Sequence, residues 1–131
     1  MITFDKVTKS YGSAVAVDEL TLDIAEGTLS VFVGPSGCGK TTSMRMINRM
    51  IDPTSGTLTV DGANVATVDP VRLRLGIGYV LQSAGLMPHL KVVDNVATVP
   101  VLKGESRRSA RKKALGVLER VGLDVKLADR Y

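Results

Sequence analysis

A glycine-rich segment that follows a short apolar run constrains this chain more than any other feature. Residues 34–42 read Gly-Pro-Ser-Gly-Cys-Gly-Lys-Thr-Thr, and the first eight fit the pattern G-x-x-x-x-G-K-[ST]. Ordinary residue frequencies produce this pattern by chance in roughly 0.004 chains of this length. The segment also lies between the β-rich run Leu29–Val33 and a stretch with helical periodicity, which is the context that a phosphate-binding loop needs. The motif therefore predicts an α/β fold with a phosphate-binding loop.

The residue types of the loop indicate how it would bind a phosphate chain. Gly34, Gly37 and Gly39 let the backbone wrap tightly, so that its N–H groups point at phosphate oxygens. The N-terminus of the following helix adds partial positive charge at the same place. Lys40 would offer a mobile cation to the β- and γ-phosphates, and the Thr41 hydroxyl would bind Mg²⁺.

Hydrophobic periodicity predicts strands and helices along the rest of the chain. The N-terminal third indicates half-buried strands up to Ile24 with a turn at residues 11–13, and Leu29–Val33 indicates a buried central strand. After the loop we expect a helix with Met44, Ile47, Met50 and Ile51 on one face, and then a strand over 57–60 with a turn at 61–62. A helix from an N-cap at Asp69 to about Leu75 and a buried strand over 77–81 should follow. The last predicted elements are a helix over 92–99 before Pro100 and a helix over 107–121 with Gly122 as its C-cap.

Composition and charge argue against several other classes of protein. Hydrophobic residues make up 44% of the 131 residues and charged residues 23%, which supports a packed core and excludes intrinsic disorder. Aromatic residues make up only 4%, and the basic cluster in residues 107–113 has no aromatics between its cations, so we interpret it as a solvated helix face and expect no nucleic-acid partner. Cys38 has no acid or histidine within the motif to act as its base, so we do not expect a catalytic nucleophile.

Short motifs along nearly the whole chain point to one family. They are Ser10-Tyr11-Gly12, the loop 34–42, Met46-Ile47-Asn48-Arg49, Pro53-Thr54-Ser55-Gly56, Ile77-Gly78-Tyr79-Val80, Gln82, Gly85-Leu86, Pro88-His89, Asn95 and Val99-Pro100. With these motifs the chain resembles the ATP-binding subunits of ABC transporters. The Met-Ile-Asn-Arg and Gly-Leu-x-Pro-His stretches favour importers of osmoprotectants such as glycine betaine, choline and other quaternary amines. Met87 departs from that subgroup, which usually has Phe at this position.

The resemblance implies a site for ATP and Mg²⁺. Tyr11 matches the aromatic residue that stacks on adenine, which suits the face of a tyrosine ring. By the same resemblance, Lys40 and Gln82 are the catalytic residues, and Thr41 and Gln82 are the residues that reach Mg²⁺. The residues expected to bind the nucleotide are Tyr11, Gly34, Pro35, Ser36, Gly37, Cys38, Gly39, Lys40, Thr41 and Thr42.

The resemblance also implies a fold and an assembly. The chain looks like a partial P-loop NTPase domain of the ABC type, with a β-subdomain and P-loop core over about 1–82, and a glutamine loop and the start of a helical subdomain over about 83–131. Its implied function is to couple ATP binding and hydrolysis to osmoprotectant uptake. The expected partners are a transmembrane permease and a second ATP-binding subunit, at the cytoplasmic face of the membrane. A non-catalytic nucleotide-binding fragment and an importer of another substrate class, such as amino acids, stay open as alternatives.

The sequence lacks two segments that the family uses for hydrolysis. It contains neither the Leu-Ser-Gly-Gly-Gln signature nor an Asp-Glu segment after a late core strand. We therefore expect this chain by itself to bind Mg-ATP weakly and not to turn it over. We also expect the apolar runs 29–33 and 77–81 to lack neighbouring strands, which would leave exposed strand edges.

Overall fold

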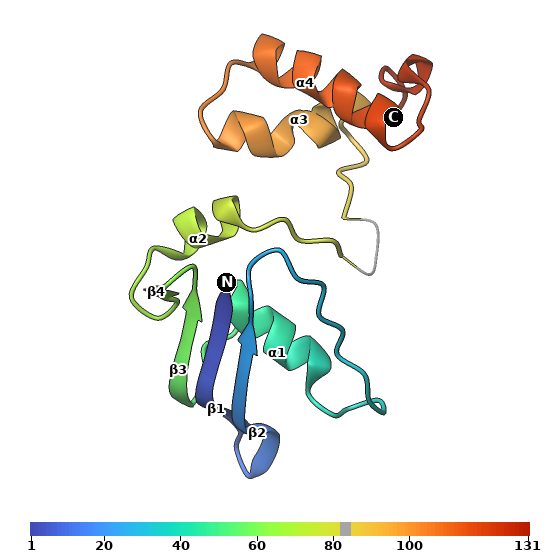
Figure 1. The fold of residues 1–131 in the computed structure, drawn as a ribbon. Helices are drawn as coiled ribbons and strands as arrows, with labels where there is room; N and C mark the ends of the chain where they lie inside the picture. The colour runs from blue at the N-terminus through green and yellow to red at the C-terminus, as the bar shows by residue number, and fades with distance from the viewer. Residues whose placement is uncertain (82–84) are drawn as a thin grey trace. The chain divides into compact units, whose positions relative to one another are not determined.

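A computed structural model describes residues 1–81 and 85–131, so Gln82 lies outside the described residues. The chain divides into two compact units, Met1–Ile77 and Gly78–Tyr131 (Figure 1). The first contains β1 (Ile2–Tyr11), β2 (Ala14–Ile24), α1 (Lys40–Ile47), β3 (Ser55–Val60), β4 (Ala63–Asn64) and α2 (Pro70–Gly76). The second contains α3 (Val92–Leu102), α4 (Arg107–Arg120) and the 3₁₀ turn η1 (Val125–Leu127).

The first unit is built on an antiparallel sheet with strand order β2-β1-β3-β4. Its core packs α1 against one face of this sheet, as Figure 1 shows. The buried side chains of the core are Phe4, Val7, Val17, Met46, Leu58 and Val65. Burial of each large apolar side chain of this kind contributes about 1.5–3 kcal/mol to folding. The core therefore fixes the position of α1, and with it the end of the glycine-rich loop.

A bulge in β1 changes which residues of that strand face the core. Phe4 and Val7 are three residues apart and would lie on opposite faces of a regular strand, yet both are fully buried. The register of β1 against β2 shifts between these two residues, and Lys6 between them has a φ of 46°. The extra residue of a bulge restores the inward orientation of Val7. Simple alternation could not predict this.

Gly56 of β3 lies against the bulge in β1, so a substitution there can test how much this close approach affects stability. Its φ is 82°, and a Cβ built on it would be 2.2 Å from the carbonyl oxygen of Lys6. Gly62 has a similar φ of 77° with no atom within 4 Å of such a Cβ. We expect Gly56→Ala to lower the free energy of unfolding by about 2–4 kcal/mol, and Gly62→Ala by only the left-handed strain of about 1–2 kcal/mol. Urea unfolding followed by circular dichroism measures both, and equal losses would show that the close contact at Gly56 has no energetic weight.

The predicted apolar face of α1 is confirmed only in part, because Ile47 and Ile51 pack against the core while Met44 and Met50 are exposed. Ser43 and Met46 are its buried residues, whereas Met44 is 46% exposed. The helix ends at Ile47, so Met50 falls beyond it, and the predicted periodicity does not extend that far. The prediction for α2 is confirmed, because Asp69 is its N-cap and accepts a hydrogen bond of 2.8 Å from the backbone N–H of Arg72.

The two apolar runs predicted as buried strands form no strand in the structure. Leu29 is 92% exposed and Val80 is 93% exposed, and in the described residues neither run belongs to the sheet. The prediction of burial is wrong for these runs, because β-structure needs a neighbouring strand to pair its backbone N–H and C=O groups. The expected exposed strand edges are also not present at these two runs, because neither of them forms a strand.

The second unit is a helical hairpin with a core of small side chains. Alanines at three of its contact positions allow α3 and α4 to approach closely; the buried residues are Val93, Ala97, Ala110, Ala114, Leu118 and Ala128. The prediction that the helix over 92–99 ends before Pro100 is wrong, because α3 continues to Leu102 with the proline inside it. Pro100 lies in the last turn, where its missing N–H removes only one helical hydrogen bond.

The predicted end of α4 at Gly122 is confirmed. Gly122 has a φ of 76°, and its N–H donates to the carbonyl of Glu119 over 3.0 Å. The N–H of Leu123 donates to the carbonyl of Leu118 over 2.9 Å, which completes a Schellman cap. Among the described residues, no helix has both the length and the apolar character that a membrane crossing requires.

Candidate functional site

The glycine-rich loop is held against β2 by the close approach of one glycine. Gly39 has a φ of 89° and directly precedes α1, which begins at Lys40. A Cβ on Gly39 would be 2.4 Å from the carbonyl oxygen of Ala16 in β2. Only glycine fits there, because both the backbone conformation and the space exclude a side chain. The loop is therefore fixed at its C-terminal end by the sheet as well as by the helix.

The Lys40 side chain turns back onto the loop that precedes it. Its Nζ donates to the carbonyl oxygens of Gly34 and Pro35, over 2.8 and 2.7 Å, and lies 3.4 Å from Sγ of Cys38. The two carbonyl oxygens are neutral acceptors, whereas an anionic acceptor would add Coulomb attraction to the same ammonium. A phosphate group would supply anionic oxygens for the same ammonium, so this donor fits a phosphate ligand.

The N-terminus of α1 supplies further donors beside Lys40. Thr41 and Thr42 belong to the first turn of α1, whose backbone N–H groups have no partner within the helix. An anion at this helix end is also favoured by the helix dipole. Ser36 and Gly37 form the exposed turn of the loop, and Gly37 has a φ of 83°. The predicted loop residues thus lie together on one segment of the first unit that leads into α1.

Tyr11 lies at the end of β1, close in the sheet to the β2 segment that contacts the loop. It pairs with Ala14 of β2, two residues before Ala16, the residue that Gly39 approaches. The Tyr11 side chain is 51% exposed, and Nζ of Lys9 lies 5.1 Å from the centre of its ring. The sheet therefore brings an available aromatic ring to the same side of the first unit as the loop.

The metal ligands predicted from the sequence are described only in part. Thr41 lies in the first turn of α1, but Gln82 lies outside the described residues. Among residues 1–81 and 85–131, no group of three or more His, Cys, Asp or Glu side chains lies close enough to hold a metal ion. A magnesium ion at Thr41 would therefore take most of its oxygen ligands from phosphate and water, as Mg²⁺ commonly does.

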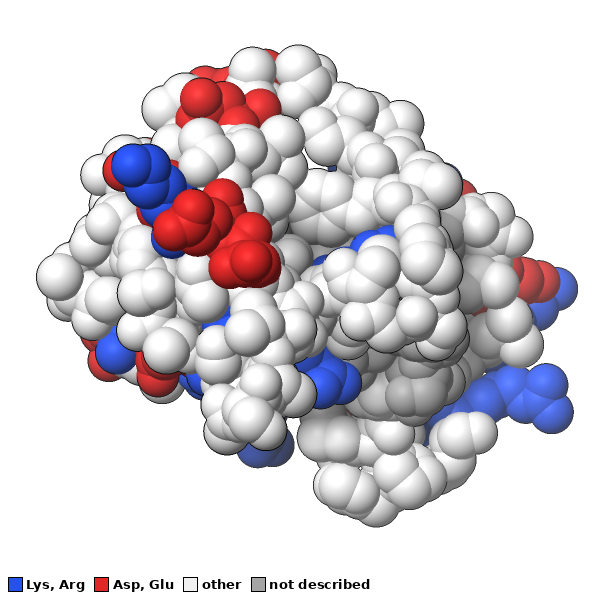
Figure 2. Space-filling model, turned by 90° about the horizontal axis from the view of Figure 1, so that it is seen from below, with Lys and Arg blue, Asp and Glu red and all other residues white. Residues whose placement is uncertain are grey.

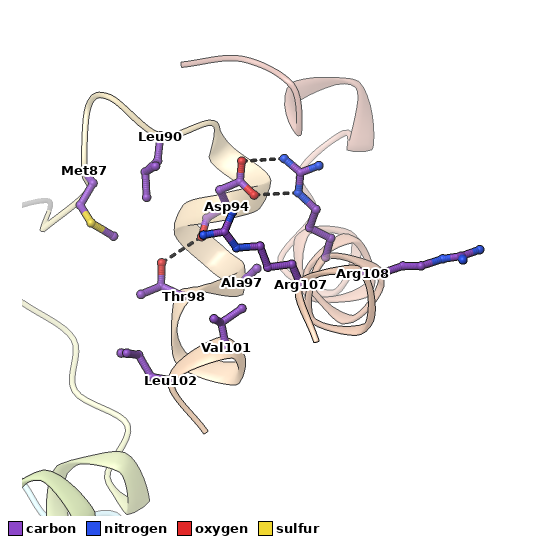
Figure 3. Close-up of a pocket in the computed structure, with 10 residues that line it drawn as sticks. Met87, Leu90, Asp94, Ala97, Thr98, Val101, Leu102, Arg107 and Arg108 are labelled. Carbon is purple, nitrogen blue, oxygen red and sulfur yellow. Dashed lines mark hydrogen bonds and ion pairs between the residues drawn. The ribbon is translucent and has the colours of Figure 1, made fainter. Parts of the chain in front are cut away.

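A second concave site lies within the helical unit and was not predicted. It is a groove of about 730 Å³, shown in Figure 3, between α3, the loop before it and the start of α4. Its apolar lining is Met87, Leu90, Ala97, Val101 and Leu102. Asp94 and Arg111 form one rim through two hydrogen bonds of 2.7 Å each. Asp94 is the one charged residue of α3, which is the signal that could have singled it out.

The ion pair at this rim depends on pH in a defined direction. The hydrogen bonds from Arg111 hold the pKa of Asp94 below its ordinary value. A carboxyl with a lowered pKa in the folded state stabilises the fold above its ordinary pKa, and this contribution is lost as the pH falls through the lowered value. The pair therefore holds α3 to α4 at neutral pH.

Asn95 holds the loop on the other side of the groove. Its Nδ2 donates to the carbonyl oxygens of Met87 and Leu90, both over 3.1 Å, and to that of Lys91 over 3.2 Å. Its Oδ1 accepts from the backbone N–H of Met87 over 2.7 Å. One amide thus satisfies several backbone groups of residues 87–91, a role that the sequence motif containing Asn95 did not reveal.

The basic cluster of α4 is partly neutralised by neighbouring acids. Arg111 pairs with Asp94, and Lys113 pairs with Glu105 over 2.7 Å. Arg108 points away from the groove in Figure 3. On the face of the molecule shown in Figure 2, uncharged residues cover most of the surface, and acidic and basic side chains occur together.

Comparison with known proteins gives concordant results. The family model described as "ABC transporter" matches residues 17–131. The carnitine transport ATP-binding protein of Listeria monocytogenes serotype 1/2a (strain 10403S) is 45% identical over 132 residues, which cover 100% of this chain and 33% of that protein. The glycine betaine/carnitine/choline transport ATP-binding protein of Bacillus subtilis (strain 168) is 44% identical, with coverage of 100% and 35%.

The fold also matches a solved structure. A dimeric ATP-binding cassette in a post-hydrolysis state, bound to ADP and Pi, superposes with a TM-score of 0.86 at 30% identity. The match covers 98% of this chain and 60% of that one. The chain thus spans about a third of the length of the curated relatives and about three fifths of the solved cassette.

Proposed function

Because this chain belongs to the ABC transporter family, we propose that it forms part of the ATP-binding subunit of an importer for osmoprotectants. The substrates would be quaternary amines such as glycine betaine and choline, the class named for the B. subtilis relative. The observation that carries the proposal is the Lys40 ammonium at the start of α1, which donates to backbone carbonyls of the glycine-rich loop. Such a donor is suited to the terminal phosphates of ATP.

The proposed site has three parts, which are the phosphate-binding loop, the base-stacking Tyr11 and the magnesium ligands Thr41 and Gln82. The loop residues Gly34, Pro35, Ser36, Gly37, Cys38, Gly39, Lys40, Thr41 and Thr42 bind the phosphates, and Tyr11 stacks on the base. Lys40 stabilises the negative charge of the phosphate chain, and the Thr41 hydroxyl is a magnesium ligand. When bound, Mg-ATP supplies the γ-phosphate that is hydrolysed. We assign Gln82 to the magnesium and the attacking water on the family resemblance alone.

The proposal extends to partners and location. The relatives named as transport ATP-binding proteins support a transmembrane permease as partner, and the dimeric cassette supports a second ATP-binding subunit. A subunit of this kind lies at the cytoplasmic face of the membrane. In this assignment, residues up to about 82 carry the phosphate loop and residues from about 83 begin the helical subdomain. We propose no nucleic-acid partner.

Uptake measurements in the native cell test the importer assignment. We expect Lys40→Ala at the chromosomal locus to abolish salt-stimulated uptake of radiolabelled glycine betaine or choline, because it removes the phosphate-binding cation. Uptake of labelled amino acids serves as the control and should not change. Loss of amino-acid uptake with normal uptake of quaternary amines would contradict the proposed substrate class.

A substitution at Tyr11 tests the proposed contact with the base. We expect Tyr11→Ala to weaken ATP binding by about 1–3 kcal/mol, the usual cost of losing a base–aromatic stack. GTP binding should weaken by a similar amount, because stacking distinguishes poorly between purines. Equilibrium titration with both nucleotides in the presence of Mg²⁺ measures the change, and Tyr11→Phe should keep most of the affinity. An unchanged affinity in Tyr11→Ala would mean that Tyr11 is only a turn residue.

A further inference from the structure

Lys9 contacts both the predicted base-stacking residue and the segment that follows the phosphate-loop helix. Lys9 and Tyr11 both lie in the last three residues of β1. The Lys9 ammonium lies over the Tyr11 ring, 5.1 Å from its centre, which is within the range of a cation–π interaction. The same Nζ donates a hydrogen bond of 2.8 Å to the carbonyl oxygen of Asp52.

The anchor at Asp52 is itself held in place. The N–H of Thr54 donates to the carbonyl of Thr8 over 2.8 Å, and the N–H of Ser10 donates to Oγ1 of Thr54 over 3.0 Å. The carboxylate of Asp52 accepts a hydrogen bond of 3.0 Å from Arg49. Residues 52–54 are therefore fastened to the end of β1 from several directions. A lysine on this anchor has less freedom to move off the ring than a lysine on an open surface.

The Lys9 contact leaves one face of the Tyr11 ring for a ligand. The ammonium lies over the ring, and about half of the surface of Tyr11 stays exposed, which leaves room for a second flat group on the ring. An aromatic ring fixed by a cation on one side loses little conformational freedom when a flat group stacks on the other side. The cation also attracts the π-electrons of the ring, which reduces the repulsion between the tyrosine ring and the π-system of a stacked purine.

We propose that Lys9 is a positioning residue for the base of the nucleotide, which acts through Tyr11 and makes no contact with the phosphates. This inference rests on the proposed function, since it concerns the same ATP site. The inference also divides the binding free energy between the base and the phosphates of the ligand. Lys9 should contribute to affinity only for ligands that carry a base, whereas Lys40 should contribute for any polyphosphate.

Isothermal titration of the full protein with Mg-ATP and with inorganic tripolyphosphate tests this division. We expect Lys9→Met to weaken ATP binding by about two- to five-fold and to leave tripolyphosphate binding unchanged. Lys9→Arg should restore most of the ATP affinity, because a guanidinium also interacts with an aromatic face. Lys112→Met, which removes the same charge from the exposed side of α4, should affect neither ligand.

The outcomes separate this inference from the proposal on which it rests. Equal weakening of ATP and tripolyphosphate by Lys9→Met would overturn the positioning role, since it would indicate a general effect of charge or folding. Unchanged or tighter ATP binding would also overturn it, because Lys9 would then be idle or would compete with the base. If the unaltered protein bound tripolyphosphate and ATP equally well, Tyr11 and Lys9 would have no base to position, although the phosphate loop would stand. If the unaltered protein bound neither ligand, the proposed function itself would fail.

Discussion

Lys40→Ala should abolish detectable binding of Mg-ATP. The substitution removes an ammonium that would form charge-assisted hydrogen bonds to the terminal phosphates, each worth about 1.5–3 kcal/mol. Lys40 would give up its bonds to two loop carbonyls when it binds phosphate, so the loss is the difference between the two sets of bonds together with the charge attraction. We expect an affinity at least a hundred-fold lower, on the order of 3 kcal/mol or more. Titration with a fluorescent ATP analogue measures the loss. The fold should survive, because within residues 1–81 and 85–131 the hydrogen bonds of this side chain go to Gly34, Pro35 and Cys38 of its own loop.

Two controls make this result specific. Lys112→Ala removes an equal charge from an exposed position of α4 and should bind the analogue normally. A circular dichroism spectrum of Lys40→Ala that matches the unaltered protein would exclude unfolding as the cause. Near-normal affinity in Lys40→Ala would refute the assignment of residues 34–42 as the phosphate site.

Gly39→Ala should disrupt the same site without removing any donor. Its Cβ would meet the carbonyl oxygen of Ala16 at 2.4 Å, so the loop would have to move away from β2. A displacement on the order of 1 Å can cost about a hundred-fold in a preorganised site, and we expect a loss of ATP affinity of this size. Titration calorimetry with Mg-ATP measures it.

Gly37→Ala is the matched control for Gly39→Ala. The two glycines have similar φ values, 83° and 89°, but a Cβ on Gly37 would have no atom within 4 Å. The strain of a left-handed residue, about 1–2 kcal/mol, is present with and without the nucleotide, so Gly37→Ala should lower the free energy of unfolding by that amount and keep most of the affinity. If both variants lost affinity equally, the contact between Gly39 and β2 would not position the loop.

The parts of the structure that depend on local chemistry were predictable from the sequence. The glycine-rich loop precedes a helix that begins at Lys40, Asp69 caps α2, and Gly122 ends α4. Each of these features is set by one or two residues whose backbone preferences or side-chain donors act within a few positions. Local chemistry alone predicts only that the loop binds phosphate. The family resemblance is what assigns the loop to an ATP-binding subunit.

The features that were missed depend on contacts between distant segments. The bulge that buries both Phe4 and Val7 is visible only in the pairing of β1 with its neighbours. The exposure of Leu29 and Val80 reflects missing strand partners, whereas an apolar run looks the same in a sequence whether or not a partner is present. The pairing of Asp94 with Arg111 joins residues 17 positions apart, which helix periodicity cannot reveal.

The hydrogen bonds that Lys40 makes without a ligand also affect the enthalpy and the salt dependence of nucleotide binding. Its ammonium already donates to two carbonyl oxygens, so a phosphate would replace existing hydrogen bonds and add few new ones. The gain at this residue would then come from the exchange of neutral for anionic acceptors. Attraction of that kind weakens as dissolved ions screen it, most strongly at exposed groups. Affinity for the polyphosphate should therefore fall as potassium chloride is raised, while the heat released at Lys40 stays modest.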